Sequence, residues 1–222
     1  MIKAAIFDMF ETLITLFESP VYFGPQIAAD AGIPEDRFLA LWTSTEHDRT
    51  IGKFTLEQAL ENIFKECDCY SGELVKTIAE KRKESKKECF NHLHPEIIPM
   101  LKKIKKRGAY IGVISNCFSE EADVIRKSVL FPYFDNVYLS YEQGVGKPDE
   151  EIFRRCMRAF SVNPEECLYV GDGGCLELET ASKLGMKTIQ AAWYLKEGTL
   201  QPVQRKSGFI HAEKPLDVLC FL

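Results

Sequence analysis

The sequence predicts an α/β fold: a doubly wound parallel sheet of five strands, with an all-α unit inserted near its start. Two observations lead to this prediction. Short apolar runs that end on polar residues alternate with helical patterns in residues 93–222, which is typical of right-handed crossovers and of a sheet covered on both faces. Residues 16–92 show helical periodicity and no convincing strand. We therefore expect a core of residues 1–15 and 93–222, with residues 16–92 as a separate helical unit.

The first strand is expected in residues 2–8. Its apolar run stops abruptly on the carboxylate of Asp8. A short, nearly continuous apolar run is typical of a strand that is buried on both faces of a parallel sheet.

Helix signals dominate the inserted unit. The helical pattern of residues 26–31 is closed by Gly32, a residue that commonly ends helices. Thr55, with Gln58 three residues later, forms the capping-box pattern that starts another helix. A longer helix, charged over most of its surface, is expected in residues 74–89.

Strands and helices alternate beyond residue 95. Helices are expected in residues 96–107, 150–160 and 176–184. The four further strands of the sheet are expected in residues 109–116, 134–140, 167–172 and 186–191.

Composition limits the possible partners. The chain of 222 residues contains 28 Lys and Arg and 33 Asp and Glu, for a net charge of −5, which argues against general nucleic-acid binding. The basic run in residues 102–107 falls on a helical pattern and is interpreted as a solvated face. No apolar stretch approaches the ~20 residues of a membrane span, and no signal peptide is apparent. We expect a cytoplasmic protein with reduced cysteines, without membrane or nucleic-acid partners, and either monomeric or homodimeric.

Four groups of polar residues fall at the ends of predicted strands. An open α/β sheet collects its ligand-binding groups at the carboxyl ends of the strands, and a charge that ends an apolar strand is costly without a partner. The four groups are Asp8, Ser115 with Asn116, the loop Gly146-Lys147-Pro148, and Gly171-Asp172 with Glu177.

This ordered set resembles the haloacid dehalogenase-like hydrolases over essentially the whole chain. The segment Asp8-Met9-Phe10-Glu11-Thr12 is similar to the first motif of that family, usually Asp-x-Asp-Gly-Thr or Asp-x-Asp-Gly-Val. Lys147 followed by Pro148 is similar to the third motif. The resemblance includes a helical cap inserted just after the first motif, and it implies that residues 16–92 are this cap.

The resemblance implies phosphoryl transfer assisted by Mg²⁺. Asp8 is the expected nucleophile, because a carboxylate can attack phosphorus and divide one difficult step into two easier ones. Mg²⁺ neutralises phosphate charge and prefers hard oxygen ligands. Its expected ligands are the carboxylates of Asp8, Asp172 and Glu177 and, from the resemblance, the backbone carbonyl of Phe10. Glu177 is one methylene longer than the usual Asp of the family.

Three residues are expected to contact the phosphate. The hydroxyl of Ser115 and the backbone N–H of Asn116 would bind its oxygens, and Lys147 would place a positive charge on both the nucleophile and the transferred group. In the helical unit, Arg49 and Lys53 are candidates for a substrate anion, because the corresponding loop lines the active site in helically capped relatives. The alternative for these two cations is a solvated loop between helices.

Phe10 departs from the resemblance. In phosphatases of the family an Asp at this position protonates the leaving alcohol, which is worth roughly 10²–10⁴ in rate, and a phenyl ring cannot do so. Three possibilities follow: a slow phosphatase or one restricted to good leaving groups, a 2-haloacid dehalogenase, or a phosphate-binding regulatory protein. Dehalogenases of the family also carry an aromatic residue here, but they lack the Gly-Asp pair that this chain keeps at Gly171-Asp172. We therefore expect a Mg²⁺-dependent phosphatase that acts on a small phosphorylated metabolite.

Overall fold

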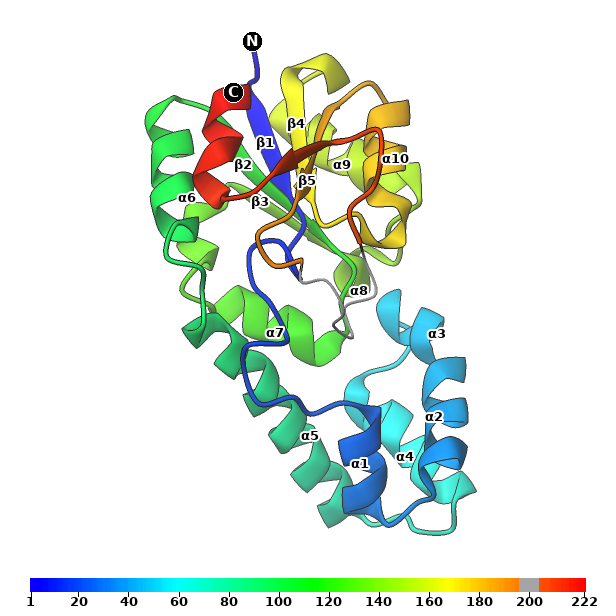
Figure 1. The fold of residues 1–222 in the computed structure, drawn as a ribbon. Helices are drawn as coiled ribbons and strands as arrows, with labels where there is room; N and C mark the ends of the chain where they lie inside the picture. The colour runs from blue at the N-terminus through cyan, green and yellow to red at the C-terminus, as the bar shows by residue number, and fades with distance from the viewer. Residues whose placement is uncertain (196–203) are drawn as a thin grey trace.

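The computed structural model describes residues 1–195 and 204–222. Figure 1 shows a sheet between layers of helices in one part of the molecule, and a group of helices that lies beyond the carboxyl ends of the strands. None of the helices in the described ranges is long and apolar enough to cross a lipid bilayer. All eight cysteines are free thiols, as expected.

The sheet consists of parallel strands in the order β3-β2-β1-β4-β5-β6. The doubly wound parallel sheet is therefore confirmed, but the expected number of five strands is wrong. The additional strand, β6, has three residues and lies at the edge beside β5. Such a short segment, with its first residue exposed, offers no apolar run by which it could be recognised in the sequence. The strands are β1 Ala4–Phe7, β2 Tyr110–Ser115, β3 Asn136–Leu139, β4 Cys167–Gly171, β5 Lys187–Ala191 and β6 Ile210–Ala212.

Alternate side chains of β1 pack on opposite faces of the sheet, as the pleat of a strand requires. Ala5 and Phe7 belong to one hydrophobic cluster, together with residues of α6 and α7, whereas Ala4 and Ile6 belong to another, together with residues of α9 and α10. Both faces of the sheet are therefore covered. The helices and 3₁₀ turns of this part are α6 Ile97–Lys106, α7 Ser119–Lys127, η2 Phe131–Tyr133, α8 Ser140–Gln143, α9 Glu150–Phe160, η3 Pro164–Glu166, η4 Gly174–Leu176, α10 Glu177–Lys183 and η5 Pro215–Phe221.

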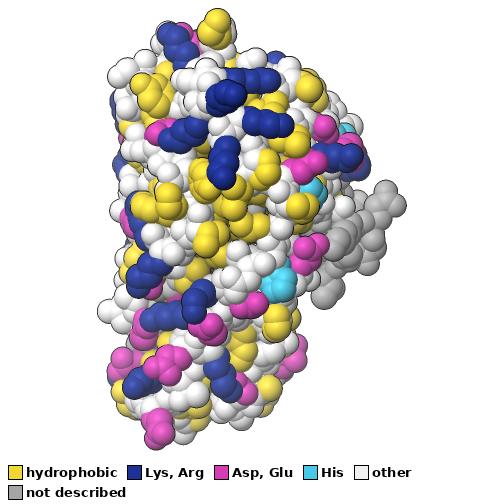
Figure 2. Space-filling model, turned by 90° about the vertical axis from the view of Figure 1, so that its left-hand side faces the viewer, with side chains coloured by type: hydrophobic (Ala, Val, Ile, Leu, Met, Phe, Trp, Pro, Cys, Tyr) yellow, Lys and Arg dark blue, Asp and Glu magenta, His cyan; other side chains and the backbone are white. Residues whose placement is uncertain are grey.

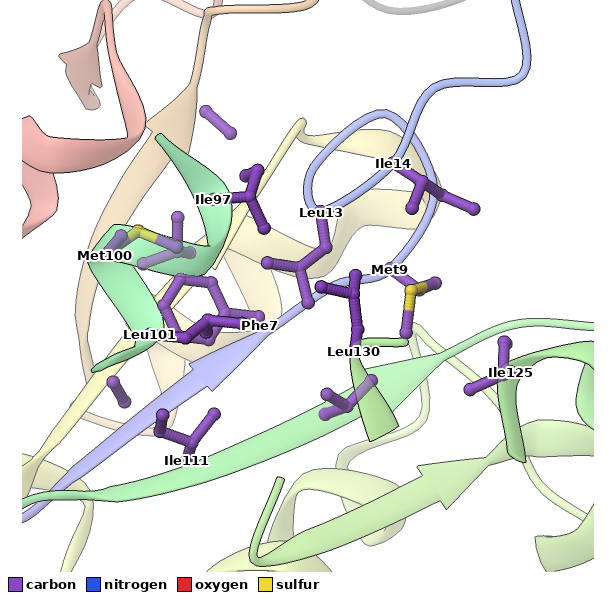
Figure 3. Packing of buried hydrophobic residues seen from close by; sticks show 14 of the residues in the cluster. Phe7, Met9, Leu13, Ile14, Ile97, Met100, Leu101, Ile111, Ile125 and Leu130 are labelled. Carbon is purple, nitrogen blue, oxygen red and sulfur yellow. The ribbon is translucent and has the colours of Figure 1, made fainter. Parts of the chain in front are cut away.

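The loop after β1 is anchored by three buried side chains. Met9, Leu13 and Ile14 are fully buried, and Figure 3 shows them in the cluster with Phe7 and residues of α6. Glu11, between these anchors, has a φ of 55°, a left-handed conformation that glycine adopts without strain. The chain thus keeps a glycine-like turn at the position where the first motif usually has glycine.

Residues 16–92, all of which the structure describes, contain helices and no strand. These helices have a hydrophobic cluster of their own, which includes Ile27, Phe38, Phe64 and Ile78. The elements are α1 Gly24–Ala31, α2 Glu35–Ser44, α3 Glu46–Thr50, α4 Leu56–Glu66, α5 Gly72–Glu88 and η1 Cys89–Asn91. The short helix α3 occupies the stretch expected to be an interhelical loop, and its five residues are too few for a periodic pattern.

Two predicted helix boundaries are confirmed by their hydrogen bonds. Gly32 ends α1 in the left-handed conformation, with a φ of 66°. At the start of α4 the backbone N–H of Gln58 donates to the hydroxyl of Thr55 at 3.2 Å, and the backbone N–H of Thr55 donates to the side chain of Gln58 at 2.9 Å. This reciprocal pair satisfies two N–H groups that the helix leaves unpaired.

The basic run in residues 102–107 lies on α6. Lys102, Lys103, Lys105 and Lys106 are exposed, whereas Ile104 between them is buried. Figure 2 views the molecule from the side of α6 and shows Lys and Arg side chains interspersed with hydrophobic ones on this part of the surface. The interpretation as the solvated face of an amphipathic helix is therefore confirmed.

Candidate active site

The register of the sheet brings Asp8 and Asp172 to one edge. Phe7 pairs with Val113 of β2 on one side and with Val170 of β4 on the other, and the N–H of Asp8 donates to the carbonyl of Val170 at 2.9 Å. Asp8 therefore emerges at the end of the central strand, and Asp172 emerges from its neighbour. The strand order reverses between β1 and β4, the place where open α/β sheets bind their ligands.

Asp8, Asp172 and Glu177 form a buried acidic cluster. One carboxylate oxygen of each lies within 4.8 Å of those of the other two, and the residues are 5%, 6% and 1% exposed. Two oxygens bound to one Mg²⁺ lie about 3–4 Å apart, because each bond is about 2.1 Å long. A set of three hard oxygen donors at this spacing fits Mg²⁺ after small side-chain movements.

Lys147 joins two of these carboxylates. Its Nζ donates to Oδ1 of Asp8 at 2.5 Å and also to Oε2 of Glu177, and the lysine is 7% exposed. Burial alone would lower the pKa of Lys147, but the negative charges of Asp8 and Glu177 outweigh it and raise the pKa. The ammonium group therefore remains charged at neutral pH beside Asp8.

Burial has the opposite effect on the aspartates, because it disfavours their charged form. The pKa of Asp8 lies well above its usual range because of burial and the nearby charge of Glu177, although Lys147 partly offsets this. Burial and Glu177 also raise the pKa of Asp172 to about 7. It is costly to ionise these neighbouring carboxylates together. A bound divalent cation would stabilise their ionised forms.

Glu177 is held from three sides. Its Oε2 accepts from Lys147 and from the hydroxyl of Tyr169 at 2.9 Å, and its Oε1 accepts from the N–H of Gly173 at 3.1 Å. A side chain at Gly171 would collide with this carboxylate, since a Cβ there would lie 2.0 Å from Oε1. Tyr169, which is fully buried, was not recognised from the sequence. The signal was present, because a tyrosine inside an apolar strand needs a partner for its hydroxyl.

Asn116 fixes the loop that carries Lys147. Its side-chain amide donates to the carbonyl of Lys147 at 2.8 Å, and its side-chain oxygen accepts from the N–H of Lys147 at 2.7 Å. Gly146 makes this approach possible, because a Cβ there would lie 2.6 Å from the amide oxygen of Asn116. The side chain of Asn116 therefore already forms hydrogen bonds with the Lys147 backbone. The predicted contact of Asn116 with phosphate involves only its backbone N–H.

A cavity of about 240 Å³ opens against the acidic cluster. Asp8, Lys147, Asp172 and Glu177 line it, together with Asn116, Gly174 and Cys175, and Phe10, Glu11, Leu16 and Phe17 complete the lining. The structure therefore brings Asp8, Phe10, Asn116, Lys147, Asp172 and Glu177 to one cavity. Their assigned roles, including that of the Phe10 carbonyl, stay predictions.

Three other predicted residues are not part of this lining. Ser115 is fully buried, and its hydroxyl donates to the carbonyl of Asn116 at 3.3 Å. Lys53 forms an exposed ion pair with Asp48 at 2.8 Å. Arg49 is 1% exposed and lies in the contact between the inserted helices and the core.

Arg49 is enclosed by aromatic rings. Its guanidinium carbon lies 3.6 Å from the ring centre of Trp42 and 4.1 Å from that of Phe118. Burial and the charge of Arg82 lower its pKa to about 10. Its Nε and Nη2 donate to protein oxygens, so the structure supports a packing role for Arg49 more directly than a contact with substrate.

Buried ion pairs join α5 of the inserted helices to α7 of the core. Nε of Arg82 donates to Glu120 at 2.6 Å, and Nζ of Lys86 contacts Glu121 at 2.8 Å. All four side chains are at most 6% exposed. These pairs fix how the inserted helices lie over the carboxyl ends of the strands.

Replacing Arg82 by alanine is expected to lower the free energy of unfolding by about 3–5 kcal/mol, because it removes the ion-pair partner of the buried Glu120 carboxylate. Denaturant unfolding monitored by circular dichroism would measure this change. The matched control is Lys81→Ala, which removes an exposed pair with Asp30 and should cost about 1 kcal/mol or less. Equal effects of the two substitutions would contradict this view of the buried pair.

Comparison with known proteins identifies a family and several relatives. Residues 2–185 match the family model described as haloacid dehalogenase-like hydrolase. A glyceraldehyde 3-phosphate phosphatase of Methanocaldococcus jannaschii is 32% identical over 98 residues, which are 44% of this chain and 43% of the relative. A phosphoserine phosphatase of Thermus thermophilus is 31% identical over 98 residues, which are 44% of this chain and 39% of the relative. The matches thus span less than half of these relatives.

Solved structures share the fold. A phosphatase from Thermococcus onnurineus superposes with a TM-score of 0.68 at 19% identity, covering 99% of this chain and 97% of the other. A 2-haloacid dehalogenase from Pseudomonas syringae superposes with a TM-score of 0.70 at 20% identity, covering the same shares. A Bacteroides thetaiotaomicron enzyme in complex with magnesium and inorganic phosphate gives 0.65 at 18% identity, covering 91% of this chain and 98% of the other. At these identities the likeness concerns the fold alone.

Proposed function

Because the chain belongs to the haloacid dehalogenase-like hydrolases, we propose that it is a Mg²⁺-dependent phosphatase that acts on a small phosphorylated molecule. The observation that carries this proposal is the buried cluster of Asp8, Asp172 and Glu177, whose oxygens lie within 4.8 Å of one another. Three carboxylates carry more negative charge than Lys147 alone can balance, so a dianionic phosphate would bind beside them only with a further cation. The names of the curated phosphatase relatives support the same substrate class.

The residues divide the work as follows. Asp8 attacks phosphorus and carries the phosphoryl group until water releases it. Lys147 stays within hydrogen-bonding reach of Asp8, where its charge orients the nucleophile and stabilises the charge of the transferred group. Asp172 and Glu177, with Asp8 and the Phe10 carbonyl, would hold Mg²⁺, which supplies further charge neutralisation at the phosphate. The hydroxyl of Ser115 and the backbone N–H of Asn116 are the proposed phosphate contacts.

The helices of residues 16–92 form the proposed cap over this site. The segment that leads from β1 into these helices supplies Leu16 and Phe17 to the cavity beside Asp8. A second cavity of about 520 Å³ lies between α3 and the loop that carries Lys147. A cap in this place excludes water from the reacting groups and contacts the leaving group. Contact of Arg49 or Lys53 with a substrate anion belongs to the same proposal and requires an arrangement in which they face the cavity.

The direct test is hydrolysis of 4-nitrophenyl phosphate with and without Mg²⁺, beside 2-chloropropionate. Phenolate release that requires Mg²⁺ is the expected result. Chloride release without metal would support dehalogenation instead. Binding of phosphate or vanadate without turnover of either compound would support a regulatory protein.

The raised pKa of Asp172 predicts how stability depends on pH and Mg²⁺. Its pKa of about 7 in the folded protein exceeds the ~3.9 of an unfolded aspartate. The folded, metal-free chain therefore binds more protons between these pH values, and its stability falls as pH rises from about 4 to about 7. Bound Mg²⁺ compensates the ionised carboxylates, so it should raise Tm clearly at about pH 8 and little at about pH 5.

Thermal unfolding followed by circular dichroism, with Mg²⁺ or with EDTA, would measure this difference. Asp172→Asn should reduce the Mg²⁺-dependent rise in Tm. A rise in Tm that is equal at both pH values would show that the metal does not compete with protons at this cluster.

A further inference from the structure

The cavity beside the acidic cluster has two unlike ends. Asp8, Lys147 and Asp172 lie at the polar end, and Phe10, Leu16 and Phe17 contribute an apolar wall. Its volume of about 240 Å³ suits a molecule of the size of a phosphorylated ring. A phosphate placed against Asp8 would therefore direct its leaving group along apolar and aromatic side chains.

The aromatic wall is supported from behind. The ring centres of Phe17 and Phe23 lie 6.3 Å apart, within the usual range for packed aromatic pairs. The ammonium group of Lys86 lies 5.7 Å from the ring centre of Phe10 and 5.1 Å from that of Phe23. Since Lys86 is 4% exposed and paired with Glu121, these rings are held by the buried contact between cap and core.

Among the described residues that line the cavity, no carboxylic acid is available to protonate the leaving group. Asp8, Asp172 and Glu177 belong to the nucleophile and the proposed metal ligands. The fourth carboxylate, Glu11, already accepts from the hydroxyl of Thr15 at 2.7 Å and from the N–H of Leu16 at 2.8 Å. These two bonds direct both of its oxygens to the chain of its own loop.

We propose, on the basis of the phosphatase function above, that the substrate is a small aryl phosphate, a phosphate ester of a phenol, whose ring lies against Phe10, Leu16 and Phe17. A phenol has a pKa of about 10, as in tyrosine, whereas the pKa of an aliphatic alcohol is close to the 15.7 of water. A phenolate therefore leaves without protonation, and an alkoxide does not. The ring in the cavity and the missing acid at position 10 point to the same substrate class.

The reaction balances without any further reactant. An oxygen of Asp8 forms a bond to phosphorus while the bond between phosphorus and the aryl oxygen breaks, and the electron pair leaves with the phenolate. The phenolate then takes a proton from water. A second water attacks phosphorus, releases inorganic phosphate and restores the Asp8 carboxylate.

The test compares kcat/KM for phenyl phosphate, ethyl phosphate and acetyl phosphate in the presence of Mg²⁺. Phenyl phosphate is expected to exceed ethyl phosphate by about 10²-fold or more, the contribution of the absent acid. Acetyl phosphate has a good leaving group but no ring, so it should be hydrolysed with a higher KM than phenyl phosphate. Equal kcat/KM for phenyl and ethyl phosphate, with Mg²⁺-dependent turnover of both, would overturn this inference and leave the phosphatase function standing. Turnover of none of the three would overturn both.

A substitution at Phe17 tests the contact with the substrate ring separately from the departure of the leaving group. Phe17 is 39% exposed, so Phe17→Ala should fold normally. It is expected to raise KM about tenfold for phenyl phosphate, a loss typical of one aromatic contact, and to leave KM for acetyl phosphate unchanged. Tyr70→Ala, at an exposed tyrosine outside the cavity, is the matched control and should change neither KM. Equal changes of KM for both substrates in Phe17→Ala would overturn the ring contact.

Discussion

Replacing Asp8 by asparagine is expected to reduce Mg²⁺-dependent phosphate release by about 10⁴-fold or more, as found when the nucleophile of a covalent mechanism is removed. The amide cannot form the phosphorylated intermediate. The substitution also removes a negative charge beside Lys147. Lys147 keeps its contact with Glu177. The measurement is kcat with 4-nitrophenyl phosphate under saturating Mg²⁺, together with circular dichroism to show that the fold persists.

The matched control is Asp36→Asn, which makes the same chemical change at an exposed position in the first turn of α2. It should leave kcat unchanged. A folded Asp8→Asn variant that retained a tenth of the original activity would mean that another group attacks phosphorus.

Replacing Phe10 by aspartate is expected to increase hydrolysis of ethyl phosphate by about 10²-fold or more, since general acid catalysis contributes roughly 10²–10⁴. Phe10 lines the cavity beside Asp8, so we expect a carboxylic acid at this position to reach the leaving group. Hydrolysis of phenyl phosphate should increase much less, because phenolate needs no proton. The ratio of the two values of kcat/KM would therefore fall in the variant.

Phe10→Asn is the control, because it removes the ring and has the size of aspartate but supplies no acid. It should not accelerate hydrolysis of ethyl phosphate. Equal gains in the asparagine and aspartate variants would show that the phenyl ring obstructs the substrate. No gain in either, with the fold intact, would contradict the assignment of Phe10 as the missing acid.

Much of the site was predictable because the topology of a parallel sheet brings distant segments together. Asp8 and Asp172 each follow an apolar strand, and a doubly wound sheet places the ends of such strands at one edge. The position of Lys147 was predictable only through the resemblance of its loop to a family motif. Nothing in its own segment indicates the contacts with Asp8 and Glu177 that the structure shows.

Other features depend on contacts that a single segment does not encode. The side chain of Arg49 has the charge that an anion site needs, but it packs between Trp42 and Phe118, which are distant in sequence from each other. The pairing of Arg82 with Glu120 likewise requires knowing which faces of α5 and α7 meet. The edge strand β6 was too short to produce a pattern.

A crystal structure determined with Mg²⁺ and a phosphate analogue would test the central claim most directly. We predict one ion bound by oxygens of Asp8, Asp172 and Glu177 and by the carbonyl of Phe10 at about 2.0–2.1 Å, with the analogue between Asp8 and Lys147. An ion bound elsewhere, or the two aspartates turned away from any shared ion, would contradict the account.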